Sequence, residues 1–232
     1  MWSAQVAALG SHGKVLAPNL PGFGDTPAAE PSVDVWARNL ASSLRARGFQ
    51  KAVFAGCSMG GYVALALLRT DPELVAGIAL VGSRAAADTE AQRSGRYAAI
   101  ERIEREGATP WASEFVQNAL SPWTHQHGRD VVGAVREIVL SQPAVSIISA
   151  QRALAARPDS TEQWADETRG FGRLIVHGAD DKLVPLEEAV ALQKRSRTSL
   201  VVVRNAGHLA PMEQPKQVSE AIDALWLQRD SS

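Results

Sequence analysis

Short apolar runs alternate with segments of helical periodicity in the first third and the last quarter of the chain. Apolar runs of this length, bounded by turn residues, are typical of buried strands. Strands that alternate with helices predict a mostly parallel sheet with helices on both faces. The predicted strands are residues 15–17, 52–55, 78–81, 174–177 and 200–203.

The segments between these runs carry helix signals. Ser32 is the predicted N-cap of a helix that ends before Gly48. Within this helix Trp36, Leu40 and Leu44 recur at a spacing of four and fall on one face. Further helices are predicted over residues 60–69, 186–194 and 217–228.

The pattern changes between residues 84 and 170, where apolar residues recur at helical spacing and no strand run interrupts them. This segment predicts an inserted helical layer, with helices over 85–106, 131–140 and 145–156. The domain organisation expected is therefore a core formed by residues 1–83 and 171–232, with residues 84–170 as a lid.

The composition is that of a globular chain. Hydrophobic residues make up 45% and charged residues 21% of 232 residues, which excludes the low hydrophobicity and high charge of disordered proteins. Lys and Arg number 24 against 25 Asp and Glu, and no block of like charge stands out. Nothing in this balance favours nucleic acid or an anionic membrane as a partner.

Cysteine usage and the lack of long apolar segments bear on location. The single cysteine, Cys57, excludes an intrachain disulfide and a multi-cysteine metal cluster, and it favours a reducing compartment. No apolar run approaches the roughly 18 residues of a membrane span, and no signal-peptide pattern follows Met1. We therefore expect a cytoplasmic protein.

The motif Gly56-x-Ser58-x-Gly60 lies between a predicted strand and a predicted helix. A serine on such a turn is held in a strained backbone conformation with its hydroxyl exposed above the sheet. The start of the following helix favours developing negative charge. The same pattern also occurs in glycine-rich turns without a catalytic role, so the motif alone leaves catalysis open.

A serine nucleophile needs a general base, and two downstream histidines adjoin predicted strands. His208 follows the strand 200–203 in a loop that can bring its imidazole over Ser58. His177 ends its own strand beside Gly178 and is better explained as a packed or solvated histidine. Weaker candidates, in polar stretches, are His12, His125 and His127.

Asp180 and Asp181 are the candidate orienting carboxylates. Both follow the strand 174–177, and both lie between Ser58 and His208 in chain order. A loop aspartate is usually a turn former. However, catalytic groups of open α/β sheets collect at the C-terminal ends of strands. Position and order together favour a serine, aspartate and histidine triad.

Four motifs in order are similar to those of one known family, the α/β-hydrolase superfamily, and the resemblance covers essentially the whole chain. In the acid loop of that family, the aspartate four residues before the proline is normally catalytic, which points to Asp181. The turn after the family's fourth strand, its nucleophile elbow, its acid loop and its histidine loop correspond to residues 20–24, 56–61, 178–185, and 206–208 with 213–215.

Within the superfamily, the Arg- and Ala-rich segment 84–170 and residues 156–160 resemble small esterases and enol-lactonases. A serine at position 58 argues against the haloalkane dehalogenase branch, whose nucleophile is an aspartate. The resemblance leaves carboxylesterase, lactonase, carrier-protein esterase and cofactor-free haloperoxidase open.

The resemblance also implies segments that this sequence does not contain. In the family, two or three strands usually come first, and the third ends in a His-Gly loop that supplies half of the oxyanion hole. The residues after Met1 resemble the helix that follows this loop. Only the backbone N–H of Met59 is then an expected oxyanion donor, and loss of one donor costs about 2.7–4 kcal/mol.

In the family's strand order, the third strand lies between those represented here by residues 15–17 and 52–55. An empty slot would leave backbone groups of both neighbours unpaired. We therefore expect an N-terminally shortened α/β-hydrolase-like sheet, in which these two strands pair directly or the natural chain starts upstream of Met1.

These residues predict a serine hydrolase that cleaves a small carboxylic ester or lactone through an acyl-enzyme. Ser58 would attack the carbonyl, His208 would transfer the proton, Asp181 would fix the imidazole tautomer, and the Met59 N–H would bind the oxyanion. No metal or organic cofactor is implied. The alternatives are a catalytically silent relative that acts as a binding protein, and a cofactor-free haloperoxidase or perhydrolase with the same triad.

The sequence does not define the substrate or the oligomeric state. Aromatic residues of the segment 84–170 could line an acyl pocket, although such residues are more often plain packing: Tyr97, Trp111, Phe115 and Trp123. Arginines of the same segment could bind a carboxylate, although interspersed glutamates favour a solvated helix face: Arg93, Arg96, Arg102 and Arg105.

Overall fold

Four of the predicted apolar runs form one parallel sheet. The computed structural model describes residues 1–11 and 13–229. Neighbouring strands all run parallel, in the spatial order β1-β2-β3-β4. His12 lies outside the described residues. The strands are β1 (Ala52–Cys57), β2 (Val75–Val81), β3 (Gly172–Gly178) and β4 (Ser199–Val203).

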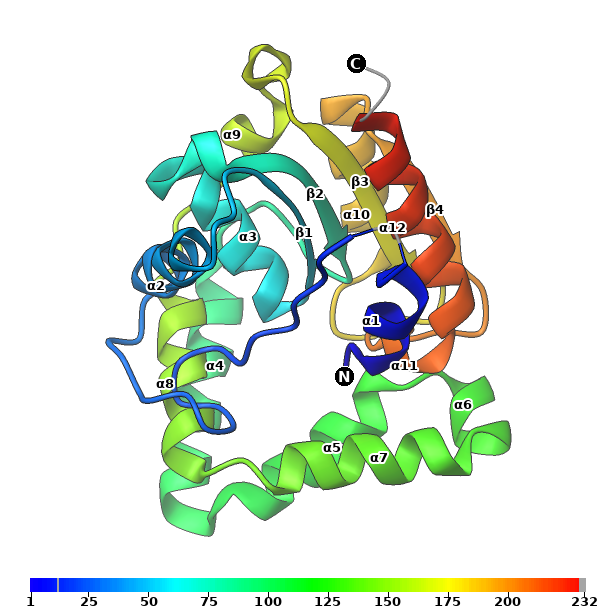
Figure 1. The fold of residues 1–232 in the computed structure, drawn as a ribbon. Helices are drawn as coiled ribbons and strands as arrows, with labels where there is room; N and C mark the ends of the chain where they lie inside the picture. Colours follow the sequence, from blue (N-terminus) through cyan, green and yellow to red (C-terminus); the bar gives the residue numbers. More distant parts are fainter. Residues whose placement is uncertain (12, 230–232) are drawn as a thin grey trace.

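Side chains alternate between the two faces of each strand, so the sheet builds two cores. Ile78 and Leu80 of β2 belong to one buried cluster, and Ala79 and Val81 belong to the other. Figure 1 shows α2 and α3 on one side of the sheet and α1 and α12 on the other. The covering helices are α2 (Val33–Ala46), α3 (Met59–Thr70) and α10 (Leu186–Ser196), and on the opposite face α1 (Ser3–Leu9) and α12 (Pro215–Arg229).

The helix α2 begins and ends where its sequence predicts. The Ser32 hydroxyl accepts a hydrogen bond from the Val35 N–H at 3.4 Å, and Gly48 follows the helix with φ +84°. Trp36 and Leu44 are buried against α3, as their spacing predicts.

Every element between β2 and β3 in the described chain is helical. The expected helix over 85–106 begins only at Glu90, because Thr89 and Gln92 form a capping box there. In Figure 1, α5 and α7 lie side by side below the sheet, and α4 packs on α8. The α-helices are α4 (Glu90–Glu106), α5 (Ala108–Ala119), α6 (Pro122–His127), α7 (Arg129–Leu140), α8 (Ala144–Ala155) and α9 (Thr161–Ala165).

A helix that spans a membrane must be both long and apolar. Across residues 1–11 and 13–229, no single helix meets both criteria. The pair α7 and α8 meets them together, but the two helices are bent by 91°.

The strand expected at residues 15–17 is not formed. This segment is extended but pairs with no strand, and β1 pairs only with β2 within the described chain. Direct pairing between 15–17 and 52–55, one of the two alternatives above, therefore does not occur in the described chain. Both segments line one cavity rather than pairing, and a segment without a hydrogen-bonded partner forms no strand.

We call this space the edge cavity, after the edge of β1. It has a volume of about 1330 Å³ and is lined by Val15, Val53, Ser58, His208 and Trp226, among other residues. Residues of both α1 and α12 contribute to its wall. The C-terminal end of β1 therefore opens into a large cavity.

A buried ionic cluster ties α4 and α8 to the core. The Asp88 carboxylate binds Arg157 at 2.6 Å and also binds Arg96 of α4, which donates to Gln151 of α8 at 3.1 Å. The Arg157 guanidinium lies over the Tyr62 ring of α3, 4.2 Å from its centre. Through Arg96 and Arg157, the Asp88 carboxylate thus connects α3, α4 and α8.

Replacing Asp88 with Asn should lower the free energy of unfolding at neutral pH by about 3–5 kcal/mol, because it leaves two arginines without their buried partner. The control is Glu90→Gln, since Glu90 forms only an exposed pair with Arg93 at 3.7 Å. Its effect should stay within about 0.5 kcal/mol. Chemical denaturation of the three proteins at pH 7 measures both differences.

The Asp88 contribution should also depend on pH. Burial by itself raises the pKa of Asp88, but the hydrogen bonds from Arg96 and Arg157 bring it below the ordinary 3.8. Its stabilising effect is therefore complete above pH 3.8 and lost as pH falls through the lower folded-state pKa. The difference between the native protein and Asp88→Asn should narrow on acidification. A difference that stays constant through the acid range would contradict this account.

Candidate active site

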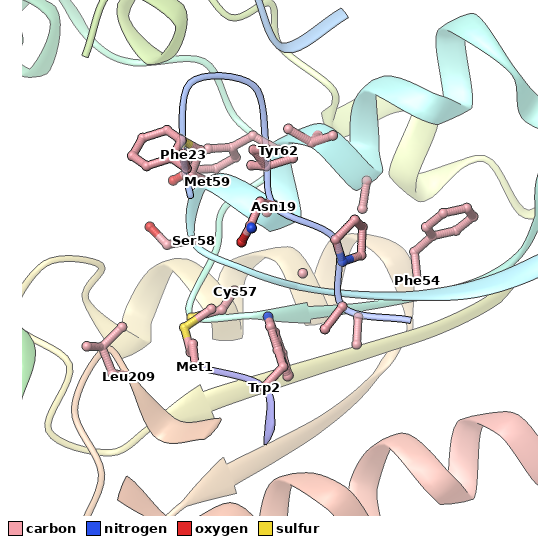
Figure 2. Close-up of a pocket in the computed structure, with 18 of the residues that line it drawn as sticks. Met1, Trp2, Asn19, Phe23, Phe54, Cys57, Ser58, Met59, Tyr62 and Leu209 are labelled. Atoms are coloured by element: carbon pink, nitrogen blue, oxygen red, sulfur yellow. The ribbon is translucent and has the colours of Figure 1, made fainter. Parts of the chain in front are cut away.

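Ser58 occupies a sharp turn between β1 and α3. Its backbone has φ 50° and ψ −113°, a conformation that non-glycine residues rarely adopt. The turn is fixed because the Ser58 N–H donates to the Val81 carbonyl at 2.9 Å and the Gly61 N–H donates to the Ser58 carbonyl at 2.9 Å. Figure 2 shows the Ser58 side chain beside the edge cavity, at the start of α3.

The glycines around Ser58 have different roles. A Cβ at Gly56 would lie 2.4 Å from backbone atoms of Gly60 and Gly61, so only glycine fits there. A Cβ at Gly61 would lie 2.2 Å from the Ser83 hydroxyl. A Cβ at Gly60 would contact no atom within 4 Å. Gly56 and Gly61, rather than Gly60, therefore permit the close approach of strand and helix.

Ser83 supports the turn from the neighbouring strand. Its hydroxyl lies 3.0 Å from the carbonyl oxygens of both Ser58 and Val81, to which it donates. No motif in the sequence singles out Ser83. The available signal was its place, since Ser83 follows Gly82 directly at the C-terminal end of β2, where φ of Gly82 is +52°.

The structure brings His208 and Asp181 together. His208 Nδ1 donates to Asp181 Oδ2 at 2.8 Å, and both side chains are buried. The other carboxylate oxygen, Oδ1, accepts the N–H groups of Leu183 and Val184, each at 2.9 Å. Asp180, by contrast, is exposed.

The environment of Asp181 keeps its carboxyl group ionised. Burial by itself raises the pKa of Asp181, but the hydrogen bond from His208 and the N–H of Val184 bring it below its ordinary value. An anionic Asp181 fixes the proton of His208 on Nδ1. Nε2 is then left as a proton acceptor on the side of the imidazole away from Asp181.

The loop of His208 is held by the junction of α5 and α6. The His208 N–H donates to the Ala119 carbonyl at 2.8 Å. Buried Glu213 of the short helix α11 (Ala210–Glu213) accepts the N–H groups of Gly207 at 2.8 Å and Ser121 at 2.7 Å. Its Oε2 also accepts the hydroxyl of Thr124 at 2.7 Å. Glu213 belongs to the histidine-loop resemblance, but no pattern in the sequence indicates this role.

Ser58 and His208 line the same cavity, as does Met59. Ser58 Oγ forms no hydrogen bond with a residue in the described part of the chain, and catalytic hydrogen bonds are often long without substrate. The N–H of Met59 is the first of α3 and therefore has no acceptor within the helix. Figure 2 shows Trp2 and Asn19 in the same cavity.

The three other described histidines, on β3 and α6, do not line the edge cavity. His177 is fully buried at the end of β3. His125 and His127 lie on α6, where they bond to the carbonyls of Gln117 at 3.2 Å and Trp123 at 3.0 Å. They are therefore part of the α6 structure rather than of the cavity.

Cys57 precedes the serine and is chemically quiet. Burial, together with the nearby charges of Asp181 and Glu213, raises the pKa of the Cys57 thiol to about 12. The thiolate is the nucleophilic form of cysteine, so Cys57 does not compete with Ser58 near neutral pH.

The aromatic and arginine candidates divide into two groups. Trp111 and Phe115 stack at 5.4 Å and line the edge cavity. Tyr97 and Trp123 are exposed. Arg96 lines the cavity while bound to Asp88. The other arginines pair with glutamates on exposed helix faces, as the interspersed charges predict: Arg93, Arg102 and Arg105.

A metal centre would need a group of ligating side chains. No group of three or more His, Cys, Asp or Glu side chains that could hold a metal ion occurs within residues 1–11 and 13–229. The polar groups of the candidate site are a strained serine, an imidazole and a buried carboxylate.

The comparison with protein families identifies the class to which this fold and site correspond. The model of the Alpha/beta hydrolase family matches residues 1–221. The chain therefore belongs to the α/β hydrolase family, which confirms the fold class expected from the four motifs.

Known relatives refine this assignment. A pimeloyl-[acyl-carrier protein] methyl ester esterase of Aromatoleum aromaticum is 26% identical, over 96% of this chain and 91% of the relative. The 3-oxoadipate enol-lactonase 1 of Acinetobacter baylyi is 27% identical, over 94% of this chain and 80% of the relative. A thermophilic esterase from Thermogutta terrifontis, solved with malate bound, is 33% identical with a TM-score of 0.91, over 98% of this chain and 84% of that one. The resemblance to small esterases and enol-lactonases is confirmed.

The glycine geometry predicts opposite results for two alanine substitutions. Gly56→Ala should lower the free energy of unfolding by about 1–3 kcal/mol, because the new methyl group meets backbone that cannot move aside. Gly60→Ala should cause no loss, because its Cβ meets open space. Thermal unfolding of both variants tests this, and equal destabilisation would contradict the assigned roles.

Proposed function

We propose that this protein is a serine hydrolase that cleaves a small carboxylic ester or lactone through an acyl-enzyme. Ser58 is the nucleophile, His208 the general base and acid, and Asp181 the residue that orients the imidazole. The backbone N–H of Met59 donates to the oxyanion. The substrate is a small molecule that enters the edge cavity.

One observation carries this proposal. The strained Ser58 opens into the same cavity as His208, whose Nδ1 is bonded to the buried Asp181 at 2.8 Å. A strained serine at a helix start has no evident structural benefit, since a glycine could join β1 to α3 at lower backbone cost. The combination with an oriented imidazole fits the requirements of an activated nucleophile.

The proposed reaction has two steps. His208 takes the proton of Ser58 as its oxygen attacks the carbonyl carbon, and the Met59 N–H stabilises the oxyanion at the positive end of α3. His208 then returns the proton to the leaving alkoxide, which departs as an alcohol or as the opened end of a lactone. Water, activated by the same imidazole, releases the acid and restores Ser58.

The names of the relatives support this class of substrate. One relative acts on a methyl ester and another on an enol-lactone, and both are covered over most of their length. We include in the proposal that residues 84–170 form the lid over the site and that the protein is cytoplasmic. The single buried Cys57 supports the latter.

Ser58 should be the only serine that a fluorophosphonate probe labels covalently, because it alone among the described serines combines a strained elbow with a histidine that lines the same cavity. Intact-mass analysis should show one adduct on the native protein and none on Ser58→Ala. Adducts that persist in Ser58→Ala would overturn the assignment.

The same pair of proteins should be assayed on short-chain esters and lactones. The proposal expects turnover that Ser58→Ala abolishes. A labelled but inactive native protein across this panel would favour the silent binding protein. Turnover only with peroxide and halide would favour the haloperoxidase.

Asp180 and Asp181 provide a matched test of which aspartate orients His208. Asp181→Asn should lower kcat by about 10⁴-fold, because the amide donates to His208 and favours the wrong tautomer. Asp180→Asn should leave kcat nearly unchanged, since Asp180 is exposed. Steady-state kinetics on one activated ester compares them. The reverse order of effects would assign the role to Asp180.

A further inference from the structure

A second imidazole lies against the carboxylate of Asp181. His177 Nε2 is 3.6 Å from Asp181 Oδ2, the same oxygen that accepts the hydrogen bond from His208. The His177 side chain is fully buried, and the proposed mechanism gives it no part. A buried ionisable group in such a place calls for a physical explanation.

The hydrogen bonds of His177 define its tautomer. Its Nε2 lies 2.8 Å from the carbonyl oxygen of Val184, which can only accept, so the ring carries its hydrogen on Nε2. Its Nδ1 has no hydrogen-bond partner among the residues that the structure describes. A hydrogen on Nδ1 would therefore be buried without an acceptor, which is unfavourable. The neutral Nε2–H form fits both contacts.

This hydrogen bond closes a ring around the acid loop. The Val184 N–H donates to Asp181 Oδ1 at 2.9 Å, while the Val184 carbonyl accepts from His177 at 2.8 Å. Val184 is thus held through both its backbone N–H and its backbone carbonyl. With Oδ1 occupied by loop N–H groups, only Oδ2 remains to meet His208.

We propose that His177 is a positioning residue for the catalytic acid: its Nε2–H holds the loop of Val184 so that Asp181 presents Oδ2 to His208. The inference rests on the proposed function, since it assigns His177 a part in the same triad. It differs from plain packing in one respect. A packing residue can be replaced by any side chain of similar volume, whereas this role requires a donor at the position of Nε2.

Two substitutions separate the roles. Glutamine and methionine have similar length and volume, but only glutamine ends in an N–H donor. His177→Gln should keep kcat within about threefold of the native value, whereas His177→Met should lower kcat about 10- to 100-fold, because small misplacements of catalytic groups are costly. The effect should fall on kcat more than on KM, because His177 itself does not line the cavity.

The proton on His208 Nδ1 gives a readout that packing alone would not move. Its NMR signal should keep its downfield position in His177→Gln and shift upfield or broaden in His177→Met. Equal kcat values in the two variants, or an unchanged signal in His177→Met, would overturn the proposal. If His177→Met does not fold, ¹⁵N NMR of the native protein decides, since an Nδ1–H tautomer of His177 would also overturn it.

Failure of this inference can be distinguished from failure of the proposed function. Hydrolysis that Ser58→Ala abolishes, together with equal activity of the two His177 variants, removes only the role of His177. Hydrolysis that survives in Ser58→Ala removes the proposed function itself.

Discussion

Backbone segments meet at the C-terminal edge of the sheet with no room for an additional methyl group, and the candidate site depends on this contact. A Cβ at Gly56 would lie 2.4 Å from the start of α3, and one at Gly178 would lie 2.0 Å from the Gly207 carbonyl. Gly82 forms a further turn, and this turn packs closely against His208. The serine, acid and histidine loops are therefore pressed together by main-chain packing. The side chains need no long reach to meet, which limits the entropy lost in holding them.

Local signals in the sequence predicted most of the fold. The strands β1 to β4 are dense apolar runs, and α2 carries its own cap and apolar face, so short-range patterns suffice for them. Residues 15–17 have a similar apolar pattern but form no strand, because a strand exists only with a hydrogen-bonded partner and this segment lines the edge cavity rather than pairing with β1. The late start of α4 depends on a capping box that apolar periodicity does not register.

The candidate site could also be predicted only in part, because some of its contacts form only when separate segments meet in the fold. Ser58 and His208 stand in motifs at strand ends, and the choice of Asp181 over Asp180 came from a family resemblance rather than from the residues alone. The contacts of Ser83, Glu213 and His177 join positions that are far apart in sequence or face one another only after folding. No periodicity or spacing encodes such contacts. They arise from the packing of loops whose composition is ordinary.

The helical segment between β2 and β3 is bound at two separate places, by Asp88 on the side of α4 and α8 and by Glu213 near α6. The second attachment reaches the loop of His208 itself through Gly207 and Ala119. Protein engineers often exchange such segments between relatives to alter substrate range. In this protein, a chimera that replaced residues 119–124 without their partner at position 213 would leave a carboxylate buried beside mismatched donors. Recombination boundaries should therefore be placed after α6, so that the histidine loop and its support are inherited together.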